Sequence, residues 1–150
     1  FPILNEYPRD NRLTVQESLG RTGADELVSR RINAVPGLRF EPAQIRVPPG
    51  RRVALTFTNA DINMQHNLVV VRPERLKPIG EASELMAADP RAIARHYVPD
   101  DSGVLALSPV LNPGGQYTIY FNAPQKSGTY RIVCTFPGHW RVMQGTMVVE

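Results

Sequence analysis

The chain has 150 residues and a mass of 16.7 kDa, with 42% hydrophobic and 21% charged residues, which is typical of one globular domain. No apolar run approaches the roughly 20 residues needed to span a membrane, so we expect no membrane span. The net charge of +3 comes mainly from 15 Arg, and no dense basic run is interleaved with aromatic residues, which argues against nucleic-acid binding.

The N-terminal part of the chain differs from the rest. The first residue is Phe1 rather than Met, so we expect that an upstream signal peptide, tag or neighbouring domain was removed. Residues 1–30 are polar and show no sustained periodicity. We therefore predict an N-terminal extension at 1–30, with one strand around Arg12 to Val15, and a globular domain at 31–150.

Short alternating segments separated by turn signals follow the extension. Segments with polar and apolar residues in alternation, or with a continuous apolar run, occupy 51–59, 66–71, 116–121, 129–134 and 145–150. The turn signals between them are P-P-G at 48–50, N-P-G-G at 112–115 and K-S-G at 126–128. Several short strands with regular turns predict an all-β protein, a β-sandwich or barrel.

One segment has helical composition. Residues 81–97 are rich in Ala, Leu, Met and Arg, which predicts one or two short helices inserted into the sandwich. Asp89 is the expected N-cap, with Pro90 at the first helical position. His96 lies in this segment without a partner motif, and we interpret it as a surface or capping histidine.

The segment CTFPGHWRVMQG at 134–145 gathers the soft ligands of the chain. It holds the only Cys, one of three His and one of four Met. Cys134 ends one predicted strand and Met143 precedes the next, so Cys134, His139 and Met143 share one loop. His66, at the start of an apolar strand, is the best candidate for a fourth ligand. Each residue alone is more often structural, but two His, one Cys and a weak axial Met together form the ligand set of a blue-copper electron-transfer site.

These motifs resemble those of azurins, which are cupredoxins. C-T-F-P-G-H followed by Met four residues after the His resembles the azurin copper loop, and M-Q-H-N at 64–67 is similar to the segment around the first azurin His ligand. Y-V-P-D-D-S-G-V-L-A at 97–106 resembles the segment after the azurin helical insertion. The resemblance covers about residues 32–150. It implies an eight-stranded Greek-key sandwich with one type 1 copper that carries single electrons.

The resemblance also implies roles for individual residues. His66, Cys134 and His139 would be the strong equatorial ligands and Met143 the weak axial ligand. The backbone carbonyl of Gln65 is a candidate distant axial contact, although azurins have Gly at this position. Azurins also carry a disulfide near the N-terminus, which a single Cys excludes here.

Three neighbours of the ligands would support the site. Asn67 and Thr135 match positions that tie the two ligand loops together by hydrogen bonds. The backbone N–H of Phe136 would point at the Cys134 sulfur, and Pro137 removes a competing donor.

The electron would leave through His139, which is exposed in the family. Met64, Pro137, Trp140 and Arg141 are therefore candidate docking residues, although Trp140 is equally typical of a half-buried residue that packs on the loop. Arg141 favours an acidic surface on the partner. The expected partner is a redox protein, either a cytochrome or a copper or haem oxidoreductase, and the expected location is periplasmic or otherwise exported.

Other functions fit parts of the pattern. The chain would be an electron carrier rather than an enzyme, or the electron-entry domain of a larger multidomain oxidoreductase. A zinc or metal-free structural module is a third hypothesis, although structural zinc sites prefer several Cys and Met is a poor zinc ligand. A Cys–His hydrolase with Cys134 as nucleophile has no supporting signature. A binuclear copper site is excluded because it requires two bridging cysteines.

Overall fold

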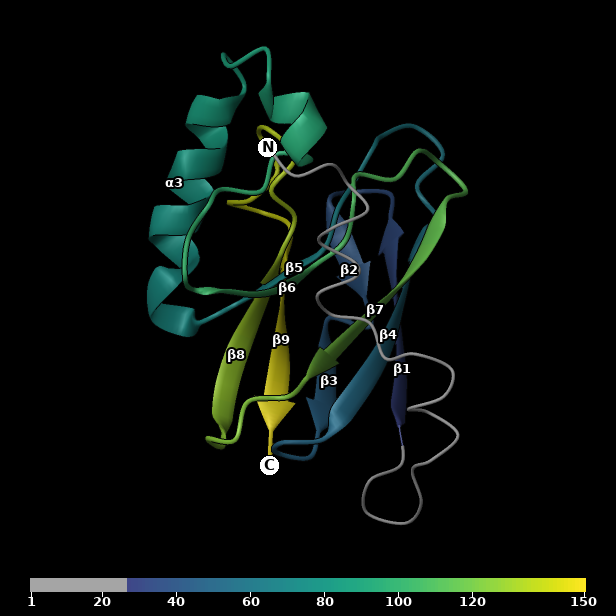
Figure 1. Cartoon of the computed structure of the whole chain (residues 1–150). Coiled ribbons are helices and arrows are strands. Elements are labelled where there is room, and N and C mark those ends of the chain that lie inside the picture. The colour runs from purple at the N-terminus through teal and green to yellow at the C-terminus, as the bar shows by residue number, and fades with distance from the viewer. Residues whose placement is uncertain (1–26) are drawn as a thin grey trace.

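The computed structural model describes residues 27–150, and the strand expected around Arg12 to Val15 lies outside them. The described part folds as a β-sandwich with one helical segment (Figure 1), as the sequence predicts. The strands are β1 (Val28–Val35), β2 (Arg39–Glu41), β3 (Gln44–Val47), β4 (Arg52–Asn59), β5 (Val69–Val71), β6 (Val104–Leu107), β7 (Gln116–Asn122), β8 (Gly128–Val133) and β9 (Gln144–Val149). Between β5 and β6 lie the 3-10 helix η2 (Pro73–Arg75), the α-helix α3 (Leu76–Met86) and the 3-10 helix η3 (Ala92–Arg95).

The strands form two sheets. The first has the order β2-β1-β4-β7 and the second the order β3-β9-β8-β5-β6. Pairs β1–β4 and β3–β9 are parallel, and the other neighbours are antiparallel. The described residues contain nine strands, one more than expected, because the chain crosses from the first sheet to the second between β2 and β3.

The core lies between the two sheets. Alternation along β4 buries Val53, Leu55 and Phe57 completely, and these side chains meet Ile132 and Met147 of the second sheet in one cluster. This alternation explains why the predicted strands at 51–59, 116–121, 129–134 and 145–150 are all confirmed within one or two residues.

Other boundaries differ from the prediction. Only Val69–Val71 of the predicted strand 66–71 is a strand, and His66 instead forms an isolated bridge with Leu111. Strands β1, β2, β3 and β6 have no counterpart among the predicted segments. Because β1 begins at Val28, the sandwich starts slightly inside the range assigned to the N-terminal extension.

The predicted helical range 81–97 is placed too late. Helix α3 begins at Leu76 and includes Pro78 in its first turn, where a missing N–H costs no helical hydrogen bond. Asp89 is not the N-cap of η3, which is Arg91, although Asp89 Oδ1 accepts the Arg91 N–H at 2.9 Å.

The expected capping role of His96 is confirmed. It ends η3 in the left-handed region (φ 53°), and its half-buried ring accepts the Val110 N–H on Nδ1 at 3.0 Å. Its backbone is therefore fixed by η3 and its ring by the Val110 N–H.

Helix α3 covers the outer face of the second sheet (Figure 1). A second apolar cluster joins the helix to that face, and it consists of Val69, Val71, Ile79, Val98, Leu107, Val133 and Trp140. The indole of Trp140 is only 5% exposed, and it fills the space beside Gly80, where a Cβ would overlap its six-membered ring. The helix thus holds the loop that carries Trp140.

This contact predicts that Gly80→Ala destabilises the protein, although Ala is the better helix former. The added methyl must displace the indole, so we expect the free energy of unfolding to fall by about 1–3 kcal/mol. Denaturant unfolding measures the change. The exposed neighbour Glu81→Ala is the control and should stay within about 0.5 kcal/mol of wild type. A stable Gly80→Ala variant would show that the indole does not need this space.

Candidate metal centre

Strands β5 and β8 place two predicted ligands at one end of the sandwich. The strands are antiparallel, with Val69 opposite Val133. His66 precedes β5 and Cys134 follows β8, so the two residues meet at the same end of the pair. The Cys134 Sγ lies 3.8 Å from the His66 Nδ1.

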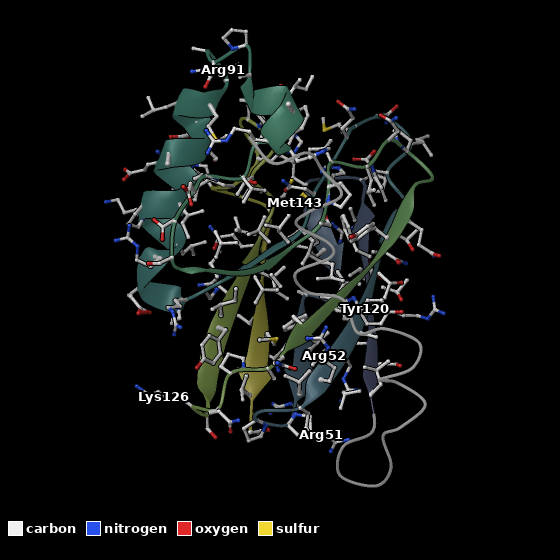
Figure 2. The ribbon with its side chains drawn as sticks, in the orientation of Figure 1. Arg51, Arg52, Arg91, Tyr120, Lys126 and Met143 are labelled. Carbon is white, nitrogen blue, oxygen red and sulfur yellow. The ribbon has the colours of Figure 1, made fainter. Side chains whose placement is uncertain are left out.

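The loop between β8 and β9 brings the other two ligands. The Cys134 N–H donates to the Met143 carbonyl at 3.1 Å, and the Met143 N–H donates to the His139 carbonyl at 2.9 Å. These bonds close the loop and place the His139 Nδ1 3.7 Å from Cys134 Sγ. Met143 is fully buried in the half of the sandwich nearer η3, and Lys126 and Arg51 lie at the opposite end (Figure 2).

The spacing of these donor atoms suits a metal ion. Single ligand atoms from His66, Cys134 and His139 all lie within 4.8 Å of one another. A first-row ion bound at about 2.0–2.3 Å in a trigonal plane separates a nitrogen and a sulfur ligand by about 3.8 Å. The two observed N···S distances match this value. The donor set therefore fits copper without rearrangement of the sheet.

The ligands differ in their access to the surface. His66, Cys134 and Met143 are fully buried, whereas His139 is 8% exposed. The two ligand loops also carry exposed apolar side chains, Met64 at 45% and Val142 at 64%. The edge of His139 is thus the one part of the four-residue set that reaches the surface.

Asn67 and Thr135 join the two ligand loops. The Asn67 Oδ1 accepts the Thr135 N–H at 2.8 Å, and the Asn67 Nδ2 donates to the Thr135 Oγ1 at 2.9 Å. The same Nδ2 donates to the His96 carbonyl at 2.9 Å, which links the helical segment to the centre. Both side chains are fully buried, so these bonds satisfy groups that water cannot reach.

Burial sets the protonation state of the thiol. Desolvation raises the pKa of Cys134 to about 12, and the backbone N–H groups of Asn67 and Phe136 act in the opposite direction. The metal-free protein therefore holds a neutral thiol at neutral pH, and metal binding must displace its proton. The pKa of His139 is lowered, mainly by burial and secondarily by the charge of His66, which favours the neutral ring that a metal needs.

Asp61 lies beside the centre and was not among the predicted site residues. Asp61 is 2% exposed, and its Oδ2 lies 2.8 Å from the His66 Nε2. The hydrogen bond from His66 is the main cause that lowers the pKa of Asp61. The segment N-A-D-I-N at 59–63 could have indicated a turn here, because Asn and Asp side chains accept backbone N–H groups two residues ahead.

One predicted docking residue, Trp140, is buried, and a second, Arg141, is exposed but paired with an acidic side chain. The prediction that Trp140 is an exposed docking anchor is wrong, because its indole packs against Gly80 as part of the second apolar cluster. Arg141 stacks over that indole at 4.5 Å and donates to both carboxylate oxygens of Glu84 at 3.0 and 3.1 Å. Pro137 is half-buried, and Met64 is exposed as expected.

The raised pKa of Cys134 predicts how stability depends on pH. The folded metal-free protein keeps the thiol proton up to about pH 12, while the unfolded chain releases it near 9.0. The contribution of the neutral Cys134 thiol to the free energy of unfolding is therefore fully present below pH 9. It is lost as pH rises toward 12, by up to about 1.4 kcal/mol per pH unit. Unfolding of metal-free wild type and Cys134→Ser at several pH values isolates this slope. Parallel curves for the two proteins would contradict the prediction.

Comparisons with known proteins agree with this geometry. The sequence model of copper-binding proteins of the plastocyanin/azurin family matches residues 28–150. Auracyanin-A of Chloroflexus aurantiacus is 34% identical over 114 residues, which cover 75% of this chain and 68% of that protein. Auracyanin-B of the same organism is 34% identical over 125 residues, and the chain spans about half of its length (79% of this chain, 50% of that protein).

A solved structure has a similar fold. The structure of auracyanin A from Chloroflexus aurantiacus, described as a "blue" copper protein, superimposes with a TM-score of 0.73 at 33% identity and covers 83% of this chain and 99% of that one. Family match, fold and donor set agree. The chain belongs to the plastocyanin/azurin family of copper-binding proteins and is an azurin-like cupredoxin.

Proposed function

We propose that the protein is a one-electron carrier rather than an enzyme. The observation that carries the proposal is the set of His66, Cys134 and His139, whose donor atoms converge inside the sandwich while only His139 reaches the surface. Copper bound there supplies a Cu(II)/Cu(I) couple, which exchanges one electron at a time.

The residues around the ligands keep them in place in both oxidation states. His66 is fixed by paired backbone bonds with Leu111, at 3.2 and 2.8 Å, and Cys134 is fixed by β8 and by its bond to Met143. Backbone N–H groups of Asn67 and Phe136 favour the Cys134 thiolate. Met143 would supply a weak thioether ligand, and the Gln65 backbone carbonyl is a proposed distant contact. Fixed ligands reduce the rearrangement that electron transfer would otherwise require.

The surface around His139 is the proposed docking site. Ile62, Met64 and Val142 are exposed and come from the two ligand loops, so they can form an apolar rim around the His139 edge. The partner would be a redox protein, a cytochrome or a copper or haem oxidoreductase. Arg141 would favour an acidic partner surface, although Glu84 already offsets part of its charge.

We also propose a periplasmic or otherwise exported location, and this proposal rests on the resemblance to azurins.

Nothing in the proposed ligand set requires residues 1–27, so the copper centre would form within the matched domain at 28–150. Among the described residues, no helix combines the length and apolar character needed to cross a membrane.

The proposal predicts a visible spectrum. Oxidised, copper-loaded protein should be intensely coloured because the Cys134 thiolate transfers charge to Cu(II). Cys134→Ser should lose this colour while its far-ultraviolet circular dichroism stays that of the sandwich. His96→Asn is the matched control, because it removes the histidine outside the centre and Asn tolerates its left-handed backbone. A colourless wild type that binds zinc in preference to copper would favour the structural-module hypothesis.

The docking surface predicts the rate of electron self-exchange. Val142→Lys puts a charge into the apolar rim, and two such rims must meet when reduced and oxidised molecules exchange an electron. We expect self-exchange, measured by NMR line broadening in mixtures of both states, to slow at least tenfold while the spectrum is unchanged. Ser127→Lys adds the same charge beside Lys126, at the opposite end of the sandwich (Figure 2). Equal slowing by both substitutions would mean that net charge, not the rim, controls the encounter.

A further inference from the structure

A buried carboxylate lies behind one of the two histidine ligands. Asp61 is 2% exposed and its Oδ2 lies 2.8 Å from the His66 Nε2, on the side of the ring away from Cys134. We propose that Asp61 is a positioning residue that fixes His66 as a ligand and lowers the reduction potential of the centre. This inference rests on the proposed function, because it concerns the same copper site.

Asp61 determines which nitrogen of the His66 imidazole carries the proton. A neutral ring carries its proton on one nitrogen and ligates through the other. An ionised carboxylate can only accept, so the His66 Nε2 donates to Asp61 and its Nδ1 keeps a free lone pair. That Nδ1 lies 3.8 Å from the Cys134 Sγ, inside the donor set. Asp61 therefore selects the tautomer that ligation needs before any metal arrives.

Asp61 is held so that its carboxylate cannot turn away from His66. Its backbone N–H donates to the Asn59 Oδ1 at 3.0 Å, and its Oδ1 accepts the Asn63 N–H at 2.9 Å. The fully buried Asn59 also donates to the carbonyls of Met64 and Leu111, both at 2.9 Å. These bonds hold the whole turn before His66, so both Asp61 oxygens have fixed directions.

Asp61 also places a negative charge close to the metal centre. Within residues 27–150, the Asp61 carboxylate pairs with the His66 ring rather than with a Lys or Arg. A negative charge in a poorly solvated place acts over short distances with little screening. It stabilises Cu(II) more than Cu(I), because the oxidised ion carries the larger charge. A carboxylate behind a ligand imidazole also raises the basicity of the ring.

The two histidines thereby differ. The His139 ring lies 5.0 Å from the Phe136 ring, centroid to centroid, and reaches the surface. The His66 ring is fully buried and backed by a carboxylate. His139 would pass the electron to the partner, and the His66–Asp61 pair would lower the reduction potential of the centre.

Asp61→Asn tests the charge. The amide keeps the size and one acceptor oxygen but removes the negative charge. Partners of this kind typically change metal affinity 10–100-fold, so we expect the preference for Cu(II) over Cu(I) to fall at least tenfold. A tenfold change corresponds to a potential about 59 mV higher, measured by redox titration of the coloured protein. The matched control is Glu150→Gln, which removes one charge from the opposite end of the sandwich, where Glu150 pairs with Arg46.

A second measurement tests the tautomer without copper. In metal-free wild type, nitrogen-15 NMR should find the His66 proton on Nε2 and slow to exchange, whereas Asp61→Ala should exchange it faster or move part of it to Nδ1. A wild-type proton on Nδ1, or equal potentials for Asp61→Asn and Glu150→Gln, would overturn the inference. A wild type that takes up no copper would instead defeat the proposed function, and the metal-free NMR result would still decide the role of Asp61. If Asp61→Asn does not fold, the wild-type proton alone decides it.

Discussion

The antiparallel pairing of β5 with β8 is the contact on which the metal centre depends. Because Val69 lies opposite Val133, the chain enters β5 and leaves β8 at the same end of the pair. That register places His66 and Cys134 close together. A slip by one residue would turn Cys134 to the other face of the sheet. The buried core between the sheets fixes the register, so the stability of the sandwich and the ligand geometry have the same origin.

Buried polar groups convert this end of the sandwich into a rigid site. Asn59, Asp61, Asn67 and Thr135 are all buried, and each makes hydrogen bonds that water cannot replace. Such networks are stabilising only when every member is satisfied, because an unpaired buried group costs about 1–3 kcal/mol. The helical segment adds a further support, since the His96 carbonyl accepts from Asn67 and Trp140 packs against α3. For the proposed electron carrier, small rearrangement of the ligands between oxidation states would be an advantage.

The sequence predicts those parts of the structure that local patterns determine. Strands β4, β7, β8 and β9 follow from alternation, and the ligand loop follows from the spacing of Cys134, His139 and Met143. Strand β1 was missed because Arg and Asn occupy its exposed positions and its pairing with β4 is distant in sequence. The burial of Trp140 depends on the missing side chain of Gly80, sixty residues away. Asp61 was missed because a local turn directs its carboxylate toward His66, and no alternation of apolar residues indicates that direction.

The central claim is that this chain holds copper through two histidines and one cysteine whose positions hardly change with oxidation state. X-ray absorption at the copper edge, recorded on the oxidised and then the reduced protein, tests it most directly. The account predicts one short sulfur ligand and two nitrogen ligands in both states, at distances of about 2.0–2.3 Å from the copper ion. Copper without a short sulfur ligand, or loss of a nitrogen ligand on reduction, would contradict it.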